Sequence, residues 1–325
     1  MSGPGPGSAG HPEARREGQV FAGQSLLSRY ASLVKLPHTL FALPFAGLGA
    51  VLASYGPDRK LTVGALFWIA VAFTAARFAA MAFNRIVDRE YDGRNPRTRQ
   101  REIPSGTMSV RQAVLSVVVM ALVFVYSAWR LNPLCAALAP VALAWVFFYS
   151  YTKRFTRLAH HVLGLALGIA PVGGYLAIAG EWSDPWFALP VLAAAVMFWV
   201  SGFDTIYSIQ DIDFDRGEGL HSIAARLGPA RAIALARMFH SFAVALFLAI
   251  WALRLFPVGF VYLSGVAAMI GLLLYENWAV RNAAVHGLDL RVIDRAFFRA
   301  NIAVSISLFA LTLIDRLLRI AGPGA

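Results

Sequence analysis

The sequence predicts an all-α integral membrane protein with nine transmembrane helices, its N-terminus inside and its C-terminus outside. Of its 325 residues, 58% are hydrophobic and only 14% are charged, whereas soluble domains are typically about 45–50% apolar and about 25% charged. Nine apolar stretches are each close to the ~20 residues that a spanning helix needs. The single cysteine, Cys135, excludes an internal disulfide framework and a multi-cysteine metal site.

The predicted spans follow one another from residue 36 to the C-terminus. They are 36–55, 61–83, 113–129, 133–151, 162–180, 186–207, 232–253, 256–275 and 300–318. Residues 1–23 are rich in Gly and Pro and lack an apolar core, so we expect a disordered cytoplasmic tail before a single domain at 24–325. A short amphipathic helix at 26–35 either lies in the membrane interface or extends the first span.

Basic residues are distributed unequally between the two sets of connecting segments. The N-terminal segment and every second loop hold 21 of the 29 Lys and Arg residues, and the opposite side holds six. The remaining two, Arg77 and Arg237, lie within predicted spans. Because cytoplasmic loops carry an excess of Lys and Arg, this asymmetry sets the predicted orientation. The net charge of +11 is therefore a topology signal and does not indicate nucleic-acid binding.

A first acidic cluster follows the second predicted span. Asn84, Asp88 and Asp92 are spaced by four residues, so on a helix they form one stripe. Two like charges four residues apart destabilise a bare helix, but a divalent cation between them reverses that effect. Ligands that are all oxygen atoms suit magnesium.

A second acidic cluster follows the sixth predicted span. Asp211 and Asp215 share a helix face, Asp204 lies two turns earlier on nearly the same face, and Asp213 points away. Acidic residues at membrane depth are costly and usually functional, and here the same spacing occurs twice on the predicted cytoplasmic side. The two clusters therefore predict a site for magnesium and a polyphosphate.

Basic residues on the same side of the membrane are candidates for binding phosphate oxygens. They are Arg94, Arg97, Arg99, Arg101, Lys153 and Arg154. The positive-inside bias explains part of this set.

Residues around the two clusters complete a recognisable family pattern. The matching residues are Asn84, Asp88 and Asp92, then Arg97, Thr98, Arg101 and Gly106, then Tyr149, Lys153, Arg154 and Thr156, and finally Asp204, Asp211 and Asp215. In this combination the chain, from about Ser28 to its end, resembles the UbiA superfamily of intramembrane aromatic prenyltransferases, and within it the 4-hydroxybenzoate polyprenyltransferase branch.

The resemblance implies a fold, an activity and roles for residues. It implies nine helices around a central lipid-accessible cavity, and magnesium-dependent transfer of a polyprenyl chain from its diphosphate to an aromatic hydroxy acid in ubiquinone or menaquinone biosynthesis. Two magnesium ions are implied, with the active site facing the cytoplasm from a bacterial-type inner membrane. The implied metal ligands are Asn84, Asp88, Asp92, Asp211 and Asp215. The four aspartates of this set are also the implied catalytic residues. The implied substrate-binding residues are Asn84, Arg97, Arg101, Tyr149, Lys153 and Asp204.

Several aromatic residues near the cytoplasmic ends of spans are candidates for stabilising an allylic cation. They are Phe41, Phe45, Phe83, Tyr149, Phe203 and Tyr207. The proton acceptor is left open between Glu90 and Asp204, and the cation for the acceptor's carboxylate between Lys35 and Arg85.

Three departures from the family pattern leave the aromatic acceptor open. Arg85 stands where the family often has aspartate, and Glu102 replaces a proline. Near the first span, residues 35–39 read Lys-Leu-Pro-His-Thr, where many 4-hydroxybenzoate enzymes have an acidic residue and Lys-Pro. These changes resemble a UbiA-like branch associated with prenylation of a dihydroxynaphthoate in the futalosine route to menaquinone. An alternative of a different class is a membrane transporter, for which Arg77, Arg237 and His240 within the spans would mark a substrate path.

Overall fold

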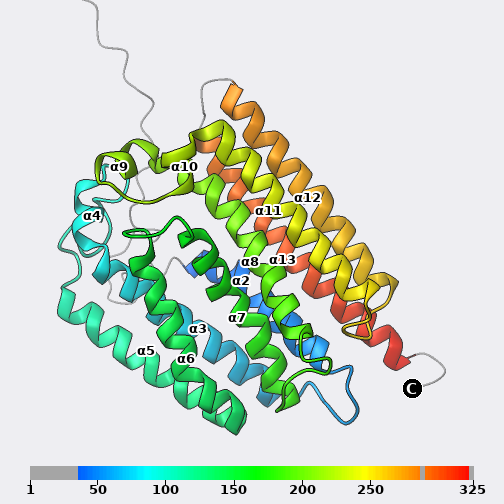
Figure 1. The fold of residues 1–325 in the computed structure, drawn as a ribbon. Coiled ribbons are helices and arrows are strands. Elements are labelled where there is room, and N and C mark those ends of the chain that lie inside the picture. Colours follow the sequence, from blue (N-terminus) through cyan, green and yellow to red (C-terminus); the bar gives the residue numbers. More distant parts are fainter. Residues whose placement is uncertain (1–35, 286–289, 322–325) are drawn as a thin grey trace, which may run out of the picture.

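The computed structural model describes the backbone of residues 36–285 and 290–321, and the side chains of 42–282 and 299–321. Every regular element within these ranges is helical, as the sequence predicts (Figure 1). The predicted tail at 1–23 and the short helix at 26–35 lie outside the described residues.

Long helices make up most of the molecule, and four short helical segments connect them in the described chain. The long helices are α2 (Leu36–Ala53), α3 (Val63–Val87), α5 (Val110–Leu131), α6 (Pro133–Thr152), α7 (Ala159–Ala179), α8 (Ala188–Tyr207), α11 (Pro229–Ala252), α12 (Phe260–Val285) and α13 (Leu290–Ala321). The short segments are α4 (Arg89–Arg94), the 3₁₀ turn η1 (Ser208–Asp211), α9 (Ile212–Gly217) and α10 (Ile223–Leu227).

Eight helices of the described chain are long and apolar enough to cross a membrane, one fewer than the nine spans predicted. The difference lies at α2, where only the shorter apolar stretch Ala42–Ala53 falls within the residues whose side chains are described. The protein is therefore an integral membrane protein.

Local sequence signals set the helix ends. Asn132 ends α5 and caps α6, its side chain accepting the Cys135 N–H at 2.9 Å, and Pro133 occupies the first turn of α6. Ser109 and Gln112 form a capping box at the start of α5. Gly180 ends α7 with φ of 69°, a left-handed conformation that favours glycine.

The largest differences from the predicted bounds are at α12 and at α13, which begins at Leu290 where the predicted span began at 300. The apolar run predicted to end at 275 continues as helix to Val285, because the polar residues that interrupt the run are buried and paired within the bundle. Glu276 accepts a hydrogen bond from the Asn301 amide at 3.2 Å, and the Asn277 amide contacts His240 Nδ1 at 3.1 Å.

The helices form two groups that meet through α2 and α7. Helices α3, α5 and α6 lie on one side and α8, α11, α12 and α13 on the other (Figure 1). The crossing of α2 and α7 is close because glycine supplies the contact: a Cβ at Gly174 would lie 2.0 Å from the Ala46 carbonyl oxygen. The main hydrophobic core surrounds the fully buried Trp199, which packs against Phe45 with ring centroids 4.9 Å apart.

An apolar cavity of about 640 Å³ opens between the two groups. Residues of α3, α6, α7 and α8 contribute to its wall, as do residues of α2 and α5. The short helices α4, α9 and α10 gather at one end of the bundle (Figure 1). This arrangement places both acidic clusters at the same end of the molecule.

Candidate active site

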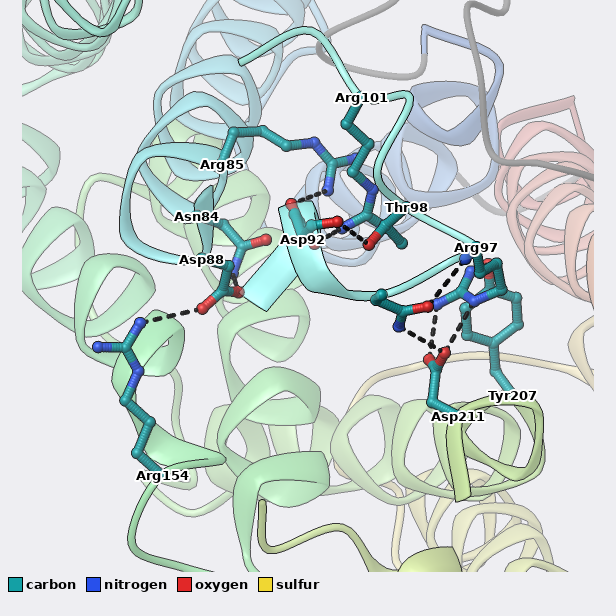
Figure 2. A network of polar contacts seen from close by, with 11 residues as sticks. Asn84, Arg85, Asp88, Asp92, Arg97, Thr98, Arg101, Arg154, Tyr207 and Asp211 are labelled. Carbon is teal, nitrogen blue, oxygen red and sulfur yellow. Dashed lines mark hydrogen bonds and ion pairs between the residues drawn. The ribbon is translucent and has the colours of Figure 1, made fainter. Parts of the chain in front are cut away.

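The first acidic cluster lies where α3 gives way to α4. The sequence predicted one continuous helical stripe, but α3 ends at Val87 and α4 begins at Arg89, with Asp88 between them at φ −89° and ψ 4°. The four-residue contact survives this break, because the Asn84 amide donates to Asp88 Oδ2 at 2.8 Å. Arg154 donates to Asp88 Oδ1 at 3.2 Å from the opposite side (Figure 2).

Asp92 turns away from Asp88 and is surrounded by cationic side chains. Arg101 Nη1 donates to Asp92 Oδ1 at 2.6 Å, and Arg85 Nη1 lies 3.9 Å from Oδ2. Thr98 donates to the Asp92 carbonyl oxygen at 3.1 Å, which ties the following loop to α4 (Figure 2). Burial, together with the negative charge of Asp92, raises the pKa of Asp88 above its ordinary value.

Asp211 joins the second acidic cluster to the first. Arg97 binds it in bidentate fashion, with Nε to Oδ1 at 2.8 Å and Nη2 to Oδ2 at 2.6 Å, and the Asn95 amide donates to Oδ1 at 3.2 Å. Arg97 also donates to the Tyr207 hydroxyl at 3.1 Å (Figure 2). One arginine from the first loop therefore cross-links the two motifs.

Asp215 lies one helical turn beyond Asp211 and is buried. Its Oδ2 atom has no hydrogen-bond partner among the described residues. Lys153 is close to the carboxylates: burial alone would lower the pKa of its ammonium group, but the negative charge of Asp215, supported by Tyr149 and Asp204, outweighs this and raises it. Lys153 therefore remains a cation within this site.

Asp204 belongs to the last turns of α8 and contacts α7. Its Oδ2 atom lies 2.6 Å from Nδ1 of the fully buried His160. The Asp204 side chain itself keeps 18% exposure.

These groups surround a polar cavity of about 180 Å³ that adjoins the apolar cavity. Asp88, Asp92, Asp211 and Asp215 all contribute to its wall. The residues that line both cavities are Asn84, Arg85, Arg101, Tyr149, Asp204 and Tyr207. The site can therefore hold a molecule with an anionic head and an apolar tail, the head among the cations and the tail in the larger cavity.

The oxygen-rich character of the polar cavity suits a divalent cation. The buried Oδ2 atoms of Asp92 and Asp215 form no hydrogen bond among the described residues, and carboxylate and amide oxygens are ligands that Mg²⁺ prefers. In the described chain no three His, Cys, Asp or Glu side chains already form a metal-binding group. Arg154, Arg101 and Arg97 instead pair with Asp88, Asp92 and Asp211.

Comparison with known proteins identifies the chain. Residues 42–302 match the model of the UbiA prenyltransferase family. The chain belongs to the UbiA prenyltransferase family. Both the family and the enzyme class predicted from the sequence are thereby confirmed.

Curated relatives and solved structures agree with this assignment. The 4-hydroxybenzoate octaprenyltransferase of Cupriavidus metallidurans is 31% identical over 298 residues, covering 91% of this chain and 96% of the relative. An apo structure of a UbiA homologue from Aeropyrum pernix is 35% identical, with a TM-score of 0.75 over 86% of this chain and 98% of the homologue. A UbiA homologue from Archaeoglobus fulgidus bound to GPP and Mg²⁺ is 18% identical and shares the fold, with a TM-score of 0.63 over 87% and 99% of the two chains.

Most of the predicted site residues of this UbiA protein lie together. Arg97, Arg101, Lys153 and Arg154 line the polar cavity. The other two candidate phosphate-binding residues do not, since Arg94 pairs with Glu218 at 2.9 Å and Arg99 is exposed. Asp213 is exposed, in agreement with its predicted outward direction.

The predicted aromatic residues divide into two sets. Tyr149, Phe203 and Tyr207 line the apolar cavity. Phe45 instead packs against Trp199, and Phe83 packs against Phe147 with ring centroids 4.4 Å apart. The side chain of Phe41 and residue Lys35 lie outside the described residues.

Sequence reasoning missed three contributors to the site. Asn95 contacts Asp211 from the first loop, and His160 contacts Asp204 from α7. Arg77, interpreted from the sequence only as an intramembrane charge, lines the apolar cavity. Arg77 alone carried a signal, because it falls seven residues before Asn84 and so lies two turns earlier on nearly the same helix face.

Proposed function

We propose that this prenyltransferase moves a polyprenyl chain from its diphosphate to an aromatic hydroxy acid of the 4-hydroxybenzoate type, in ubiquinone or menaquinone biosynthesis. The observation that carries the proposal is the polar cavity opening into the much larger apolar cavity, with six residues common to both walls. The relatives named 4-hydroxybenzoate octaprenyltransferase support the choice of substrates.

The catalytic metal is proposed to be Mg²⁺, with Asn84, Asp88, Asp92, Asp211 and Asp215 as its ligands. Two ions match the two clusters of oxygen atoms. Bound magnesium supplies Lewis-acid stabilisation of the negative charge that develops on the leaving diphosphate. The solved homologue from Archaeoglobus fulgidus with GPP and Mg²⁺ supports this choice of ion.

The cationic side chains of this protein bind and orient the diphosphate. Arg97 and Arg101 present guanidinium groups to the polar cavity, and guanidinium N–H groups donate to phosphate oxygens. Lys153 adds a compact positive charge between the two motifs. Together they stabilise the leaving group as the bond between the diphosphate oxygen and the first carbon of the prenyl chain breaks.

The wall shared by the two cavities then holds the allylic cation. The rings of Tyr149 and Tyr207 lie at this boundary and Phe203 lies beside it in the apolar cavity. Aromatic faces attract cations, and the apolar lining excludes water that would otherwise capture the cation. The acceptor ring, activated by its hydroxyl group, attacks the cation at the carbon ortho to that group.

Two arginines of α3 are candidates to bind the acceptor's carboxylate. Arg85 lines both cavities and Arg77 lines the apolar cavity. Either side chain brings a positive charge to a wall that is otherwise largely apolar, and that charge favours an anionic aromatic acceptor. We expect Arg77→Ala or Arg85→Ala to raise KM for the acceptor more than KM for the prenyl diphosphate.

A second acceptor is a dihydroxynaphthoate, prenylated in futalosine-route menaquinone synthesis. Arg85 and Glu102 favour it, since both depart from the usual pattern of the 4-hydroxybenzoate branch, and Arg85 is buried and lines both cavities. In either case we propose a bacterial-type inner membrane and an active site that faces the cytoplasm, because both motifs belong to the set of loops that holds the excess of Lys and Arg.

The test is an acceptor panel with purified, folded protein. Geranyl diphosphate and Mg²⁺ are incubated with 4-hydroxybenzoate and several hydroxynaphthoates, and both diphosphate release and prenylated product are measured. We expect product with one acceptor class and loss of turnover when EDTA removes the metal, with recovery on adding Mg²⁺. Absence of diphosphate release with every acceptor overturns the proposal.

A further inference from the structure

A buried histidine and a cavity-lining carboxylate form a pair that the steps above do not use. His160 on α7 is fully buried, and its Nδ1 atom lies 2.6 Å from Oδ2 of Asp204 on α8. Because the histidine has no exposed surface, it acts on a substrate only through the carboxylate that it contacts.

The hydrogen bonds of His160 define which ring nitrogen carries the proton. The backbone N–H of Ile223 on α10 donates to His160 Nε2 at 3.4 Å, so Nε2 provides a lone pair. Nδ1 then carries the proton and donates it to Asp204 Oδ2. In this arrangement the Nδ1–H group of the imidazole holds the Asp204 side chain in one orientation.

Asp204 is the carboxylate that lies at the boundary between the two cavities. It lines both of them, whereas each of the four motif aspartates lines only the polar cavity. The alternative base, Glu90, is exposed, pairs with Arg89 at 3.0 Å and lines neither cavity. Since His160 engages Oδ2, the other oxygen of Asp204 remains for a substrate at the boundary.

We propose that Asp204 is the base that takes the proton from the prenylated ring, and that His160 is its positioning residue. This inference rests on the proposed function. After the new carbon–carbon bond forms, the ring carbon that made it loses its hydrogen to Asp204 as a proton. The electron pair of the broken C–H bond restores the aromatic ring, and Asp204 becomes a neutral carboxylic acid.

The first test combines Asp204→Asn with an acceptor deuterated at the ring positions ortho to its hydroxyl group. Asparagine keeps the shape of the side chain but cannot take a proton. We expect product formation to fall by about 10²–10⁴-fold, the range for loss of a general base, with a primary deuterium isotope effect larger than that of the wild type. KM for the prenyl diphosphate should stay unchanged.

Three results overturn the inference: wild-type turnover in Asp204→Asn, an unchanged isotope effect, or a rise in KM for the prenyl diphosphate in place of the loss of turnover. Should Asp204→Asn fail to fold, Asp204→Glu provides the same measurement with the base displaced by one methylene group. If the wild type and the Asp204→Asn variant are both active, only this inference is contradicted. If the wild type releases no diphosphate, the proposed function itself is contradicted.

The second test separates positioning by His160 from a purely structural role. His160→Gln retains an N–H group that can donate to Asp204, and His160→Leu does not. We expect the glutamine variant to retain most of the turnover, and the leucine variant to lose it with the enlarged isotope effect of the Asp204 variant. Equal turnover in the two variants overturns the positioning role.

The adjacent histidine provides a matched control. His161 lies on the same helix but its ring packs edge-on against Phe239, with centroids 4.7 Å apart. His161→Gln should keep the wild-type isotope effect.

Discussion

The two aspartate motifs of this protein have the same spacing but different surroundings. In the first motif, cations from three directions already neutralise the carboxylates: Arg154 contacts Asp88, and Arg85 and Arg101 contact Asp92. In the second, Asp211 depends on Arg97 from the first loop, and Asp215 keeps a buried oxygen atom without a hydrogen bond among the described residues.

The difference shows how one spacing serves two roles. The first motif lies among arginines suited to diphosphate oxygens, whereas in the second motif Arg97 pairs with Asp211 and Lys153 is the cation near Asp215. The bidentate pair of Arg97 with Asp211 joins the two, so neither motif is complete alone. The expected effects of substitution should follow this division, from the aspartates themselves to the packing that holds the helices.

The largest effect should come from removing one aspartate of either motif. Asp88→Ala and Asp211→Ala each delete charge that we propose holds the metal, so turnover should fall by at least about 10²–10³-fold. The measurement is diphosphate release under saturating substrates. Asp213→Ala is the matched control, because Asp213 lies within the second cluster but is exposed. Wild-type activity in both motif variants would contradict the assignment of two metal-binding motifs.

A smaller effect is expected when the link between the motifs is cut. Arg97→Ala removes the bidentate contact to Asp211, and we expect about a 100-fold loss of turnover, the upper part of the range for residues that support ligands. Arg97→Lys should restore little of it, because an ammonium group cannot bind the carboxylate through two parallel N–H groups. Full rescue by lysine would show that Arg97 acts only as a charge.

Arg154 should contribute less than Arg97. The side chains of Arg154 and Asp88 are 33% and 29% exposed, against 12% and 10% for Arg97 and Asp211, so solvent screens their pair more strongly. We expect Arg154→Ala to reduce turnover by about tenfold. A loss equal to that of Arg97→Ala in parallel assays would mean that the two motifs depend on their arginines equally.

The smallest effect on chemistry, with a measurable effect on stability, should come from the helix crossing between the two groups. A Cβ at Gly174 would lie 2.0 Å from the Ala46 carbonyl oxygen, so Gly174→Ala should destabilise the fold by about 1–3 kcal/mol. Thermal unfolding in detergent measures the change. Its control is Gly173→Ala, where the added methyl group meets no atom within 4 Å. Equal melting temperatures for the two variants would show that α2 and α7 separate without cost.

The sequence predicted the membrane class, most helix bounds and the motif residues, because each depends on local patterns. The end of a span is predicted where an apolar run meets polar residues. At α12 this predicted end was wrong, because the polar residues Glu276 and Asn277 are hydrogen-bonded to side chains of other helices. The partners of Asp211 could not be predicted either, because they come from a segment that is far from it in the sequence. Arg97 and Asp211 are 114 residues apart in the sequence, and no periodicity relates them.

The helix break at Asp88 was also beyond a prediction from spacing. The four-residue interval is compatible with one continuous helix, and only the surrounding ion pairs show that Asp88 and Asp92 face different partners.

The wall common to the two cavities has a consequence for the direction of the reaction cycle. In the proposed reaction a prenyl diphosphate is retained at both ends, by charge in the smaller cavity and by exclusion from water in the larger one. The prenylated product carries a ring with far less charge in place of the diphosphate, so the smaller cavity binds it less tightly. Its remaining affinity is for surroundings like the hydrocarbon of the bilayer. We therefore expect the reactant to be held by two cavities and the product to leave laterally, into the lipid bilayer.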